Sequence, residues 1–242
     1  MIVLFTDFGP SGPYVGQMRS AIAKYAPSEI AIDLLSDAPA SNPKASAYLL
    51  AALAPSFPDG AIFLCVVDPG VGGDRLPLIV KAKNQVFIGP DNGLFSIVAR
   101  RSSTASVQKI TWKPGYLSAS FHGRDLFAPI AAMISTGETD ISEPISKDTL
   151  AKPDWPDDLK SIIYIDHFGN AMTGIRAKTL SATTRLEWCG NKFSYAKTFS
   201  SVESGAAFWY ENANGLAEIS INQGRADDLG LAVGEPISIL AP

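Results

Sequence analysis

The chain has 242 residues, of which 46% are hydrophobic and 18% charged, an ordinary balance for one large or two moderate globular domains. Its formal net charge of −4 gives no basic face for nucleic acid, so we expect no nucleic-acid partner. The only cysteines, Cys65 and Cys189, match no zinc or redox spacing, and no apolar run is long enough to span a bilayer. The chain opens on the strand-like IVLFTDF, without a signal-peptide pattern. We therefore expect a cytoplasmic protein with no metal site and no membrane partner.

Up to about residue 145, the pattern predicts strands that alternate with helices. Unbroken apolar runs favour strands buried on both faces of a mostly parallel sheet. The predicted strands cover residues 2–8, 30–35, 61–67, 78–82 and 86–88. Predicted helices cover residues 14–25 and 45–54, and a third begins at PDNGLF. A fourth carries an apolar stripe from Leu126 to Ile134, with Pro129 placed in its first turn.

The sequence pattern changes in the second half of the chain. Residues 147–160 are rich in proline and aspartate and are predicted to form a linker. Beyond them, TRLEWCGNKFSYA predicts a hairpin with a Gly190-Asn191 turn, and WYENANGLAEISIN predicts another that turns near residues 212–215. We therefore expect an N-terminal α/β domain over residues 1–146 and a smaller antiparallel β domain, a barrel or sandwich, over residues 161–242.

Two polar loops follow predicted strands of the first domain, where ligands bind in parallel α/β sheets. Asp7 lies in TDFG, and Asp68 begins DPGVGGD, which leads to Arg75. Asp7 could instead cap a helix or start a turn, and Asp-Pro-Gly is an ordinary turn sequence. The three glycines, however, allow the backbone to approach another group closely, and Arg75 can reach the acid.

Three further clusters combine polar residues with turn residues: FHGRD at residues 121–125, IDHFGN at residues 165–170, and NANG at residues 212–215. Each has a structural reading. A single histidine is commonly structural, an Arg-Asp pair can cap a helix, and the last two clusters are plausible turns.

Taken together and in order, TDFG, VVDPGVG with its arginine, PDNGL, FHGRD and IDHFGN resemble the S-adenosyl-L-methionine (SAM) hydroxide adenosyltransferases, or SAM hydrolases. These enzymes are relatives of the SAM-dependent fluorinase and chlorinase. The resemblance covers the chain from its start to about residue 230. It implies the two-domain fold, a homotrimer with active sites between the N-terminal domain of one subunit and the C-terminal domain of the next, and hydrolysis of SAM to adenosine and methionine without a cofactor.

The resemblance also implies a role for individual positions. Asp68, Arg75 and His122 match the set associated with water activation. Asp7 matches the residue that accepts both ribose hydroxyls, as a carboxylate can, and Asp166 matches the residue facing the methionine ammonium. The other substrate-binding positions implied are Phe8, Phe121, Gly123, Phe168, Asn170, Phe199 and Asn212.

Some positions depart from the family pattern. Gly12 stands near an acid that is common in the first loop, an aromatic residue or glutamine is replaced around Ser41, and Ala213-Asn214 replaces a polar pair. Two alternatives therefore stay open: a protein that binds SAM or adenosine without catalysis, and a halide-using enzyme. Asp68 argues against the second, because two anions about 4 Å apart repel by about 4 kcal/mol at an effective dielectric near 20.

Overall fold

The structure is a computed structural model that describes residues 1–240. The chain forms two compact units, one made of Met1–Leu50 with Phe57–Lys152 and the other of Ala51–Ser56 with the described chain from Pro153 onward. Among the described residues, no helix is both long and apolar enough to cross a membrane.

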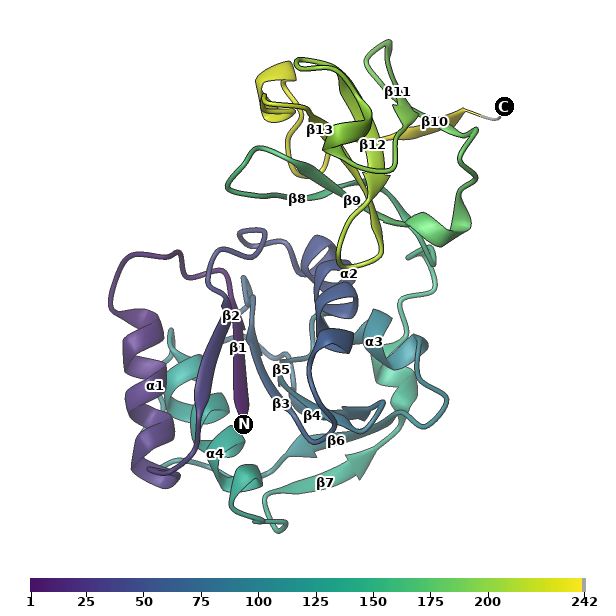
Figure 1. The fold of residues 1–242 in the computed structure, drawn as a ribbon. Coiled ribbons are helices and arrows are strands. Elements are labelled where there is room, and N and C mark those ends of the chain that lie inside the picture. The colour runs from purple at the N-terminus through teal and green to yellow at the C-terminus, as the bar shows by residue number, and fades with distance from the viewer. Residues whose placement is uncertain (241–242) are drawn as a thin grey trace. The chain divides into compact units, whose positions relative to one another are not determined.

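The first unit is built on a seven-stranded sheet (Figure 1). Its strands are β1 (Ile2–Thr6), β2 (Ala31–Leu35), β3 (Ile62–Val66), β4 (Pro77–Ala82), β5 (Gln85–Pro90), β6 (Ser106–Ile110) and β7 (Ser142–Ile145). Their order across the sheet is β2-β1-β3-β5-β4-β6-β7. Strands β2, β1, β3 and β5 are parallel, β6 runs in the same direction, and β4 and β7 run in the opposite one. The predicted α/β fold with a mostly parallel sheet is confirmed.

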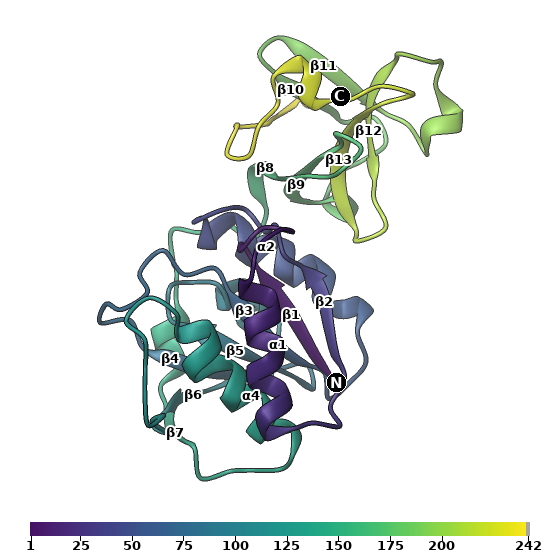
Figure 2. The same ribbon diagram turned by 90° about the vertical axis from the view of Figure 1, so that its left-hand side faces the viewer.

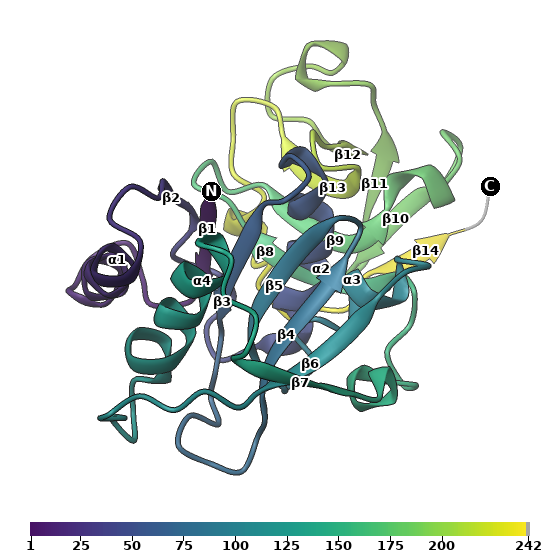
Figure 3. The same cartoon turned by 90° about the horizontal axis from the view of Figure 1, so that it is seen from below.

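Helices cover both faces of this sheet (Figures 1 and 3). They are α1 (Tyr14–Tyr25), α2 (Pro43–Leu53), α3 (Ser96–Arg100) and α4 (Ala128–Ser135). Helices α1 and α4 pack together on one face, while α3 and the part of α2 within the first unit lie on the other. A π-helical turn, η2 (Gly123–Phe127), precedes α4, and it leaves Pro129 in the first turn of α4 as predicted. The first unit also contains a 3-10 segment, η3 (Lys147–Leu150), whereas the 3-10 segment η1 (Ala54–Ser56) belongs to the second unit.

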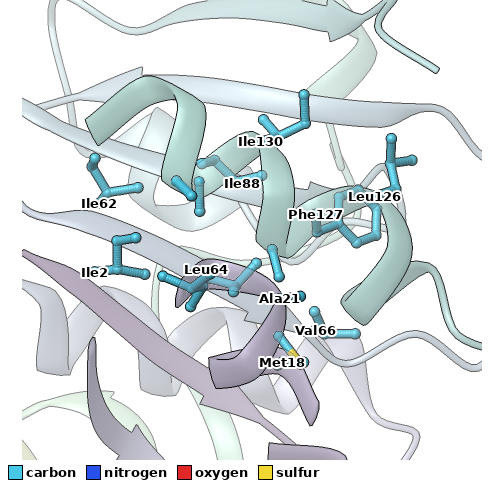
Figure 4. Packing of buried hydrophobic residues seen from close by; sticks show 14 of the residues in the cluster. Ile2, Met18, Ala21, Ile62, Leu64, Val66, Ile88, Leu126, Phe127 and Ile130 are labelled. Carbon is cyan, nitrogen blue, oxygen red and sulfur yellow. The ribbon is translucent and has the colours of Figure 1, made fainter. Parts of the chain in front are cut away.

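The core beneath α1 and α4 follows from strand alternation. Ile2 and Leu4 point to this face because side chains two residues apart share a face of a strand. Met18 of α1 and Ile130 of α4 pack against them, as Figure 4 shows for part of this cluster. Val3 is also fully buried, so the sheet is covered on both sides and forms a rigid base for the loops at its edge.

The second unit is a curled sheet of seven strands (Figure 2). They are β8 (Leu159–Ile165), β9 (Ala171–Arg176), β10 (Arg185–Trp188), β11 (Asn191–Tyr195), β12 (Ala207–Glu211), β13 (Leu216–Ile221) and β14 (Ser238–Leu240). The order is β14-β10-β11-β12-β13-β9-β8, and only the β11–β12 pair is parallel. Three 3-10 turns connect them: η4 (Ala177–Thr179), η5 (Phe199–Ser201) and η6 (Asp227–Leu229).

The two edges of this sheet are joined by one segment of chain. Ser161 of β8 forms an antiparallel bridge with Pro236, and the chain then continues into β14, which pairs with β10. The backbone N–H of Ile162 also donates to the carbonyl of Glu235 at 2.9 Å. This connection gives the unit the barrel-like closure that was one of the predicted forms, and it leaves few open strand edges.

The β10–β11 hairpin turns one residue earlier than predicted. Trp188 pairs with Asn191, so the two turn residues are Cys189 and Gly190, with φ of 47° and 82°, and the predicted Gly190-Asn191 turn is wrong. Two consecutive positive φ values are what a tight hairpin turn requires. The register is fixed because Leu186 and Phe193 are paired and both buried in the core.

Candidate active site

An ion pair occupies the loop that follows β3. The guanidinium of Arg75 donates hydrogen bonds to both carboxylate oxygens of Asp68. Its Nε lies 2.8 Å from Oδ1 and from Oδ2, and its Nη2 contacts Oδ2. The side chains are 3% exposed for Asp68 and 10% exposed for Arg75. A pair so well shielded from water is far stronger than a surface salt bridge, so it fixes both side chains in one geometry.

The glycine-rich part of this loop makes a close backbone contact within the protein. Gly72 has φ of +82°, and a Cβ there would lie 2.5 Å from the carbonyl oxygen of Ala119. The cleft beside the ion pair is bordered by Pro69 and Val71 but by none of the three glycines. Close backbone approach was correctly predicted, but the partner is the loop before His122.

His122 completes the cluster from the opposite side. Its Nδ1 lies 2.9 Å from Nη2 of Arg75. Because a guanidinium can only donate, Nδ1 must accept this hydrogen bond, and the proton of the neutral ring is on Nε2. Burial, followed by the charge of Arg75, lowers the pKa of His122 from its ordinary value of 6.5. The ring is therefore neutral at pH 7 and can donate a hydrogen bond from Nε2.

Asp7 lies at the end of β1, next to the end of β3 in the sheet. Its Oδ2 accepts the backbone N–H of Ser41 at 2.8 Å, and burial raises the pKa of Asp7, with a smaller contribution from the charge of Asp68. Ser41 has φ of 54°, an unusual conformation for a residue with a side chain. This strained turn aims an N–H at Asp7, so the region around Ser41 noted in the sequence lies at the site.

Three aromatic rings meet beside these polar groups. Phe8 contacts Tyr14 and Phe121, with ring centroids 5.8 Å and 5.7 Å apart, and Tyr14 lies 5.5 Å from Phe121. Gly123 lies under this group, where a Cβ would be 3.3 Å from the ring of Phe121. The rings provide an apolar wall suited to a flat or aromatic ligand.

The structure thus brings the predicted residues of the first unit together at one cleft, which Arg75 does not line but adjoins through its contacts with Asp68 and His122. The residues that line it are Asp7, Phe8, Ser41, Val66, Asp68, Pro69, Val71, Ser120, Phe121, His122 and Gly123. Ser41 and Val71 were not among the predicted site residues, and the strained φ that marks Ser41 has no signal in the sequence. Within residues 1–240, no group of three or more His, Cys, Asp or Glu side chains is arranged to hold a metal ion.

In the second unit, Asp166 organises the turn between β8 and β9. Its Oδ1 accepts the backbone N–H groups of Phe168 and Asn170, and its Oδ2 accepts the side-chain amide of Asn170, all at 2.9 Å. Phe168 is 71% exposed. The structural reading of this motif as a turn is therefore correct, and the ring of Phe168 is exposed on it.

A turn from the other end of the unit supports this loop. The backbone N–H groups of Ala226 and Asp227 donate to the carbonyl of Gly169 at 3.0 Å and 3.2 Å, and Arg225 donates to the carbonyl of His167 at 2.9 Å. Gly169 has φ of +82°, and a Cβ there would lie 2.4 Å from a carboxylate oxygen of Asp227. Only glycine fits this contact.

Asn212 and a buried acid form a second cluster. Asn212 Oδ1 accepts the N–H groups of Asn214 and Leu216 at 2.9 Å and 3.0 Å, and its Nδ2 donates to Glu218 at 2.8 Å. Glu218 is 2% exposed and also accepts the hydroxyl of Tyr210. Burial raises the pKa of Glu218 and, with the bond to Glu218, that of Tyr210. Most of the hydrogen-bonding capacity of Asn212 is thus used inside the hairpin.

Phe199 joins this cluster through its ring. It lies 5.3 Å from the rings of both Phe208 and Tyr210. The charge of Asp166 also acts on Tyr210 and Glu218, so the predicted residues of the second unit share one neighbourhood. Sequence reasoning missed Tyr210 and Glu218, because on a strand they look like ordinary alternating polar positions.

Comparison with known proteins gives consistent matches over both units. The family model of the SAM hydroxide adenosyltransferase N-terminal domain matches residues 2–143, and that of the C-terminal domain matches residues 160–238. A protein named (R)-S-adenosyl-L-methionine hydrolase from Thermus thermophilus is 32% identical, with 99% of each chain covered. One of the same name from Salinispora arenicola is 31% identical, covering 98% of this chain and 96% of the relative.

Solved structures agree with this match. An uncharacterized conserved protein from Thermotoga maritima superimposes with a TM-score of 0.89 at 28% identity, with all of both chains covered. A conserved hypothetical protein from Thermus thermophilus gives a TM-score of 0.79 at 30% identity, with 99% of both covered. With both domains matched in order, and relatives above 30% identity over nearly its whole length, this chain belongs to the SAM hydroxide adenosyltransferase family.

Proposed function

We propose that this protein hydrolyses S-adenosyl-L-methionine to adenosine and L-methionine, by in-line attack of water on C5′ of the ribose. The observation that carries the proposal is the convergence of Asp68, Arg75 and His122 beside one cleft that also contains Asp7. Relatives over the full length of the chain bear the name of SAM hydrolase, which supports the same reaction.

The substrate supplies its own leaving group. As the oxygen–C5′ bond forms, the C5′–sulfur bond breaks and its electron pair returns to the positive sulfur, which leaves as the neutral thioether of methionine. Neither an acid catalyst nor a metal is needed to assist that departure. We therefore propose that the reaction uses no cofactor, and that the task of the protein is to hold and orient water.

His122 and Asp68 divide that task in our proposal. Because Nδ1 of His122 faces Arg75, the ring offers Nε2–H to the oxygen of the water. Asp68 accepts a hydrogen of the water and takes the proton late, as the new bond forms. Arg75 keeps both partners in register through its contacts with each. Fixing two reactants in this way can lower the barrier by about 7–11 kcal/mol.

The remaining residues of the cleft suit a nucleoside. We propose that Asp7 accepts the two ribose hydroxyls, since a carboxylate can take two donors at once. The rings of Phe8 and Phe121 would pack against the ribose and the carbon chain near sulfur. Gly123, which has no side chain, leaves room beside them.

We further propose that the second unit binds the rest of the substrate and that the protein is a homotrimer, each site being shared by two subunits. Asp166 would face the methionine ammonium, and Phe168, Asn170, Phe199 and Asn212 would lie around adenosine and methionine. The ring of Phe168 is 71% exposed and is therefore free to contact a ligand. The exposed, unpaired Cys189 supports a reducing, cytoplasmic location.

Mixing two impaired variants, assayed at a SAM concentration below the KM of each, tests the shared site. Asp68→Asn damages the first unit and Asp166→Ala the second, so a mixed trimer contains one intact site. At a 1:1 ratio of randomly assembled subunits, about a quarter of all sites should be restored. Recovery of activity on mixing, together with a trimer mass by light scattering, is expected. Complete lack of recovery from mixed trimers would show that each subunit holds its own site.

The reaction itself is tested in ¹⁸O-labelled water. Purified protein and SAM should give adenosine and methionine, with the label in the 5′-hydroxyl of adenosine by mass spectrometry. Release of adenine would mean cleavage at the glycosidic bond. Formation of 5′-chloro-5′-deoxyadenosine in chloride would indicate a halide-using enzyme, and intact SAM under saturating binding would indicate a binding protein. Release of adenine, formation of the chlorinated product, or persistence of intact SAM would each contradict the proposal.

A further inference from the structure

The loop that carries Asp68 and Arg75 connects β3 to β4 and crosses the end of β5, which lies between these two strands in the sheet. It leaves the carboxyl end of β3 and enters the amino end of β4, whereas β5 lies between these strands in the sheet. Because β5 is parallel to β3 and antiparallel to β4, its carboxyl end lies at the same edge. The loop therefore passes over the point where β5 ends, at Pro90.

The two residues after β5 hold both ends of this loop. The backbone N–H of Asp91 donates to the carbonyl of Leu76 at 2.8 Å. The side-chain Nδ2 of Asn92 donates to the carbonyl of Val67, also at 2.8 Å. Leu76 directly follows Arg75, and Val67 directly precedes Asp68. The dipeptide Asp91-Asn92 thus holds the carbonyl just before Asp68 and the carbonyl just after Arg75.

The side chain of Asn92 is itself fixed. Its Oδ1 accepts the backbone N–H of Leu94 at 3.2 Å, which directs Nδ2 toward Val67. Val67 is fully buried, so its carbonyl has no water to replace a lost donor. Without Nδ2, the peptide between Val67 and Asp68 would have to rotate to find another partner, and the Asp68 side chain would rotate with it. Asn92 does not line the cleft, so it can act on a ligand only through Asp68.

We propose that Asn92 is a positioning residue for the reaction, which sets the orientation of Asp68, and through Arg75 that of His122, toward the cleft. The inference rests on the proposed function for its kinetic consequence. PDNGL is one of the segments that pointed to the family, and no substrate-binding role was assigned to it. Its asparagine is explained here by the geometry of the catalytic pair.

The kinetic test uses Asn92→Asp. Aspartate keeps the shape of the side chain and the acceptor for Leu94, but it replaces the donor to Val67 with a negatively charged oxygen. A displacement of about 1 Å in a catalytic group can cost about 100-fold in rate, so we expect kcat to fall at least about tenfold while KM for SAM changes less than about twofold. The circular dichroism spectrum of the variant must show no loss of secondary structure.

A matched control lies at the other end of the same strand. Asn84 directly precedes β5, and its Nδ2 donates to Asp59 at 3.1 Å on an exposed surface. Asn84→Asp makes the same change of charge and also removes a side-chain donor, but at the opposite edge of the sheet. We expect its kcat to equal that of the wild type. An equal loss in both variants would mean a general effect on β5 and would overturn the proposal.

A second readout does not depend on turnover. His122 and His167 are the only histidines of the chain, so ¹⁵N-imidazole spectra contain two ring systems. The charged groups that act on His122 are Arg75, Asp68 and Asp125. In Asn92→Ala, which adds no charge, a displaced Arg75 should let the pKa of His122 rise toward its ordinary value and weaken the preference for the Nε2–H tautomer. The signals of His167 should not move.

The outcomes separate the two proposals. If both Asn92 variants keep wild-type kcat and an unchanged His122 titration, the positioning role is wrong. If wild-type protein does not hydrolyse SAM, the proposed function fails, and the His122 titration alone decides whether Asn92 orients the cluster. If Asn92→Asp does not fold, the same kcat and KM measurements are made on Asn92→Ala, with the same expectations.

Discussion

The two units use polar side chains in different ways. In the first, the charged groups come from distant segments and bond to one another beside the cleft: Asp68 and Arg75 form an ion pair, and His122, held at Nδ1, has Nε2–H to offer. In the second, Asp166 and Asn212 make most of their hydrogen bonds to the turns in which they lie. The first arrangement is suited to chemistry, and the second to a rigid surface that recognises a ligand. Changes in the first unit should therefore act on kcat and changes in the second on KM.

Asp68→Asn should have the largest effect. The amide keeps the size of the side chain but cannot accept the proton of the water, and it no longer pairs with the charge of Arg75. We expect kcat to fall by about 100-fold to about 10,000-fold, with little change in KM. The measurement is steady-state release of adenosine.

Asp74→Asn is the matched control, because Asp74 is an exposed acid in the same loop. It should retain wild-type kcat. A proportional loss of kcat and of SAM affinity in Asp68→Asn would remove the distinction between the two units.

Asp166→Asn probes the second unit in the same chemical terms. Asparagine keeps an oxygen that can accept the N–H groups of Phe168 and Asn170, so the turn survives, while the negative charge and the acceptor for the Asn170 side chain are lost. If Asp166 faces the ammonium of the substrate, KM should rise about tenfold, the equivalent of about 1.4 kcal/mol, and kcat should change much less. A drop in kcat at constant KM would contradict the assignment.

Gly72→Ala tests whether the loop of the first unit depends on its close contact. A Cβ at this position would lie 2.5 Å from the carbonyl of Ala119, and the positive φ adds further strain. Gly60 has a similar φ of +80° with no atom nearby, so Gly60→Ala measures the backbone strain alone. By denaturant titration, we expect Gly72→Ala to lose about 1–3 kcal/mol more unfolding free energy than Gly60→Ala does. We also expect Gly72→Ala to lower kcat. Equal losses would show that the contact is easily relieved.

The pH dependence should show the smallest effect. Protonation of His122 would place a second donor against Arg75, so the neutral ring is the active form. Since the folded-state pKa lies below 6.5, kcat should stay high at pH 6.5 and fall only at lower pH. The unfolded chain binds this proton more strongly, so the contribution of His122 to the unfolding free energy decreases as pH falls below about 6.5. A loss of kcat centred above pH 6.5 would contradict the neutral ring.

Sequence patterns predicted the elements with strong local signals. Helix α1 begins and ends as predicted, because a polar loop containing glycine and proline leads into a clear apolar periodicity. Strands β6 and β7 were missed, since SVQKI and SEPI are short and partly polar, and their pairing next to and at the edge of the sheet is decided by the rest of the sheet. The hairpin turn at Cys189 was misplaced by one residue because core pairing, and not the favourable Gly-Asn dipeptide, sets the register.

The candidate site was predicted in part for similar reasons. Motifs in order identified Asp68, Arg75 and His122, and the structure brings them together. Glu218 belongs to no motif, and Asn92 lies in the PDNGL motif without any indication of its bond to Val67, because these contacts join residues in different strands or loops. The pairing of Gly72 with Ala119 joins residues 47 positions apart and is likewise invisible to local patterns.

The insertion of β5 between β3 and β4 has a consequence for how the molecule acquires activity. Strands β4 and β5 form a hairpin, which must dock on β3 through β5 before Asp91 and Asn92 reach the ends of the catalytic loop. The loop that carries Asp68 and Arg75 therefore does not reach its final geometry until β5 has docked on β3. Catalytic competence during refolding is expected to arrive only after this three-strand unit has closed, later than the local turns of the same loop.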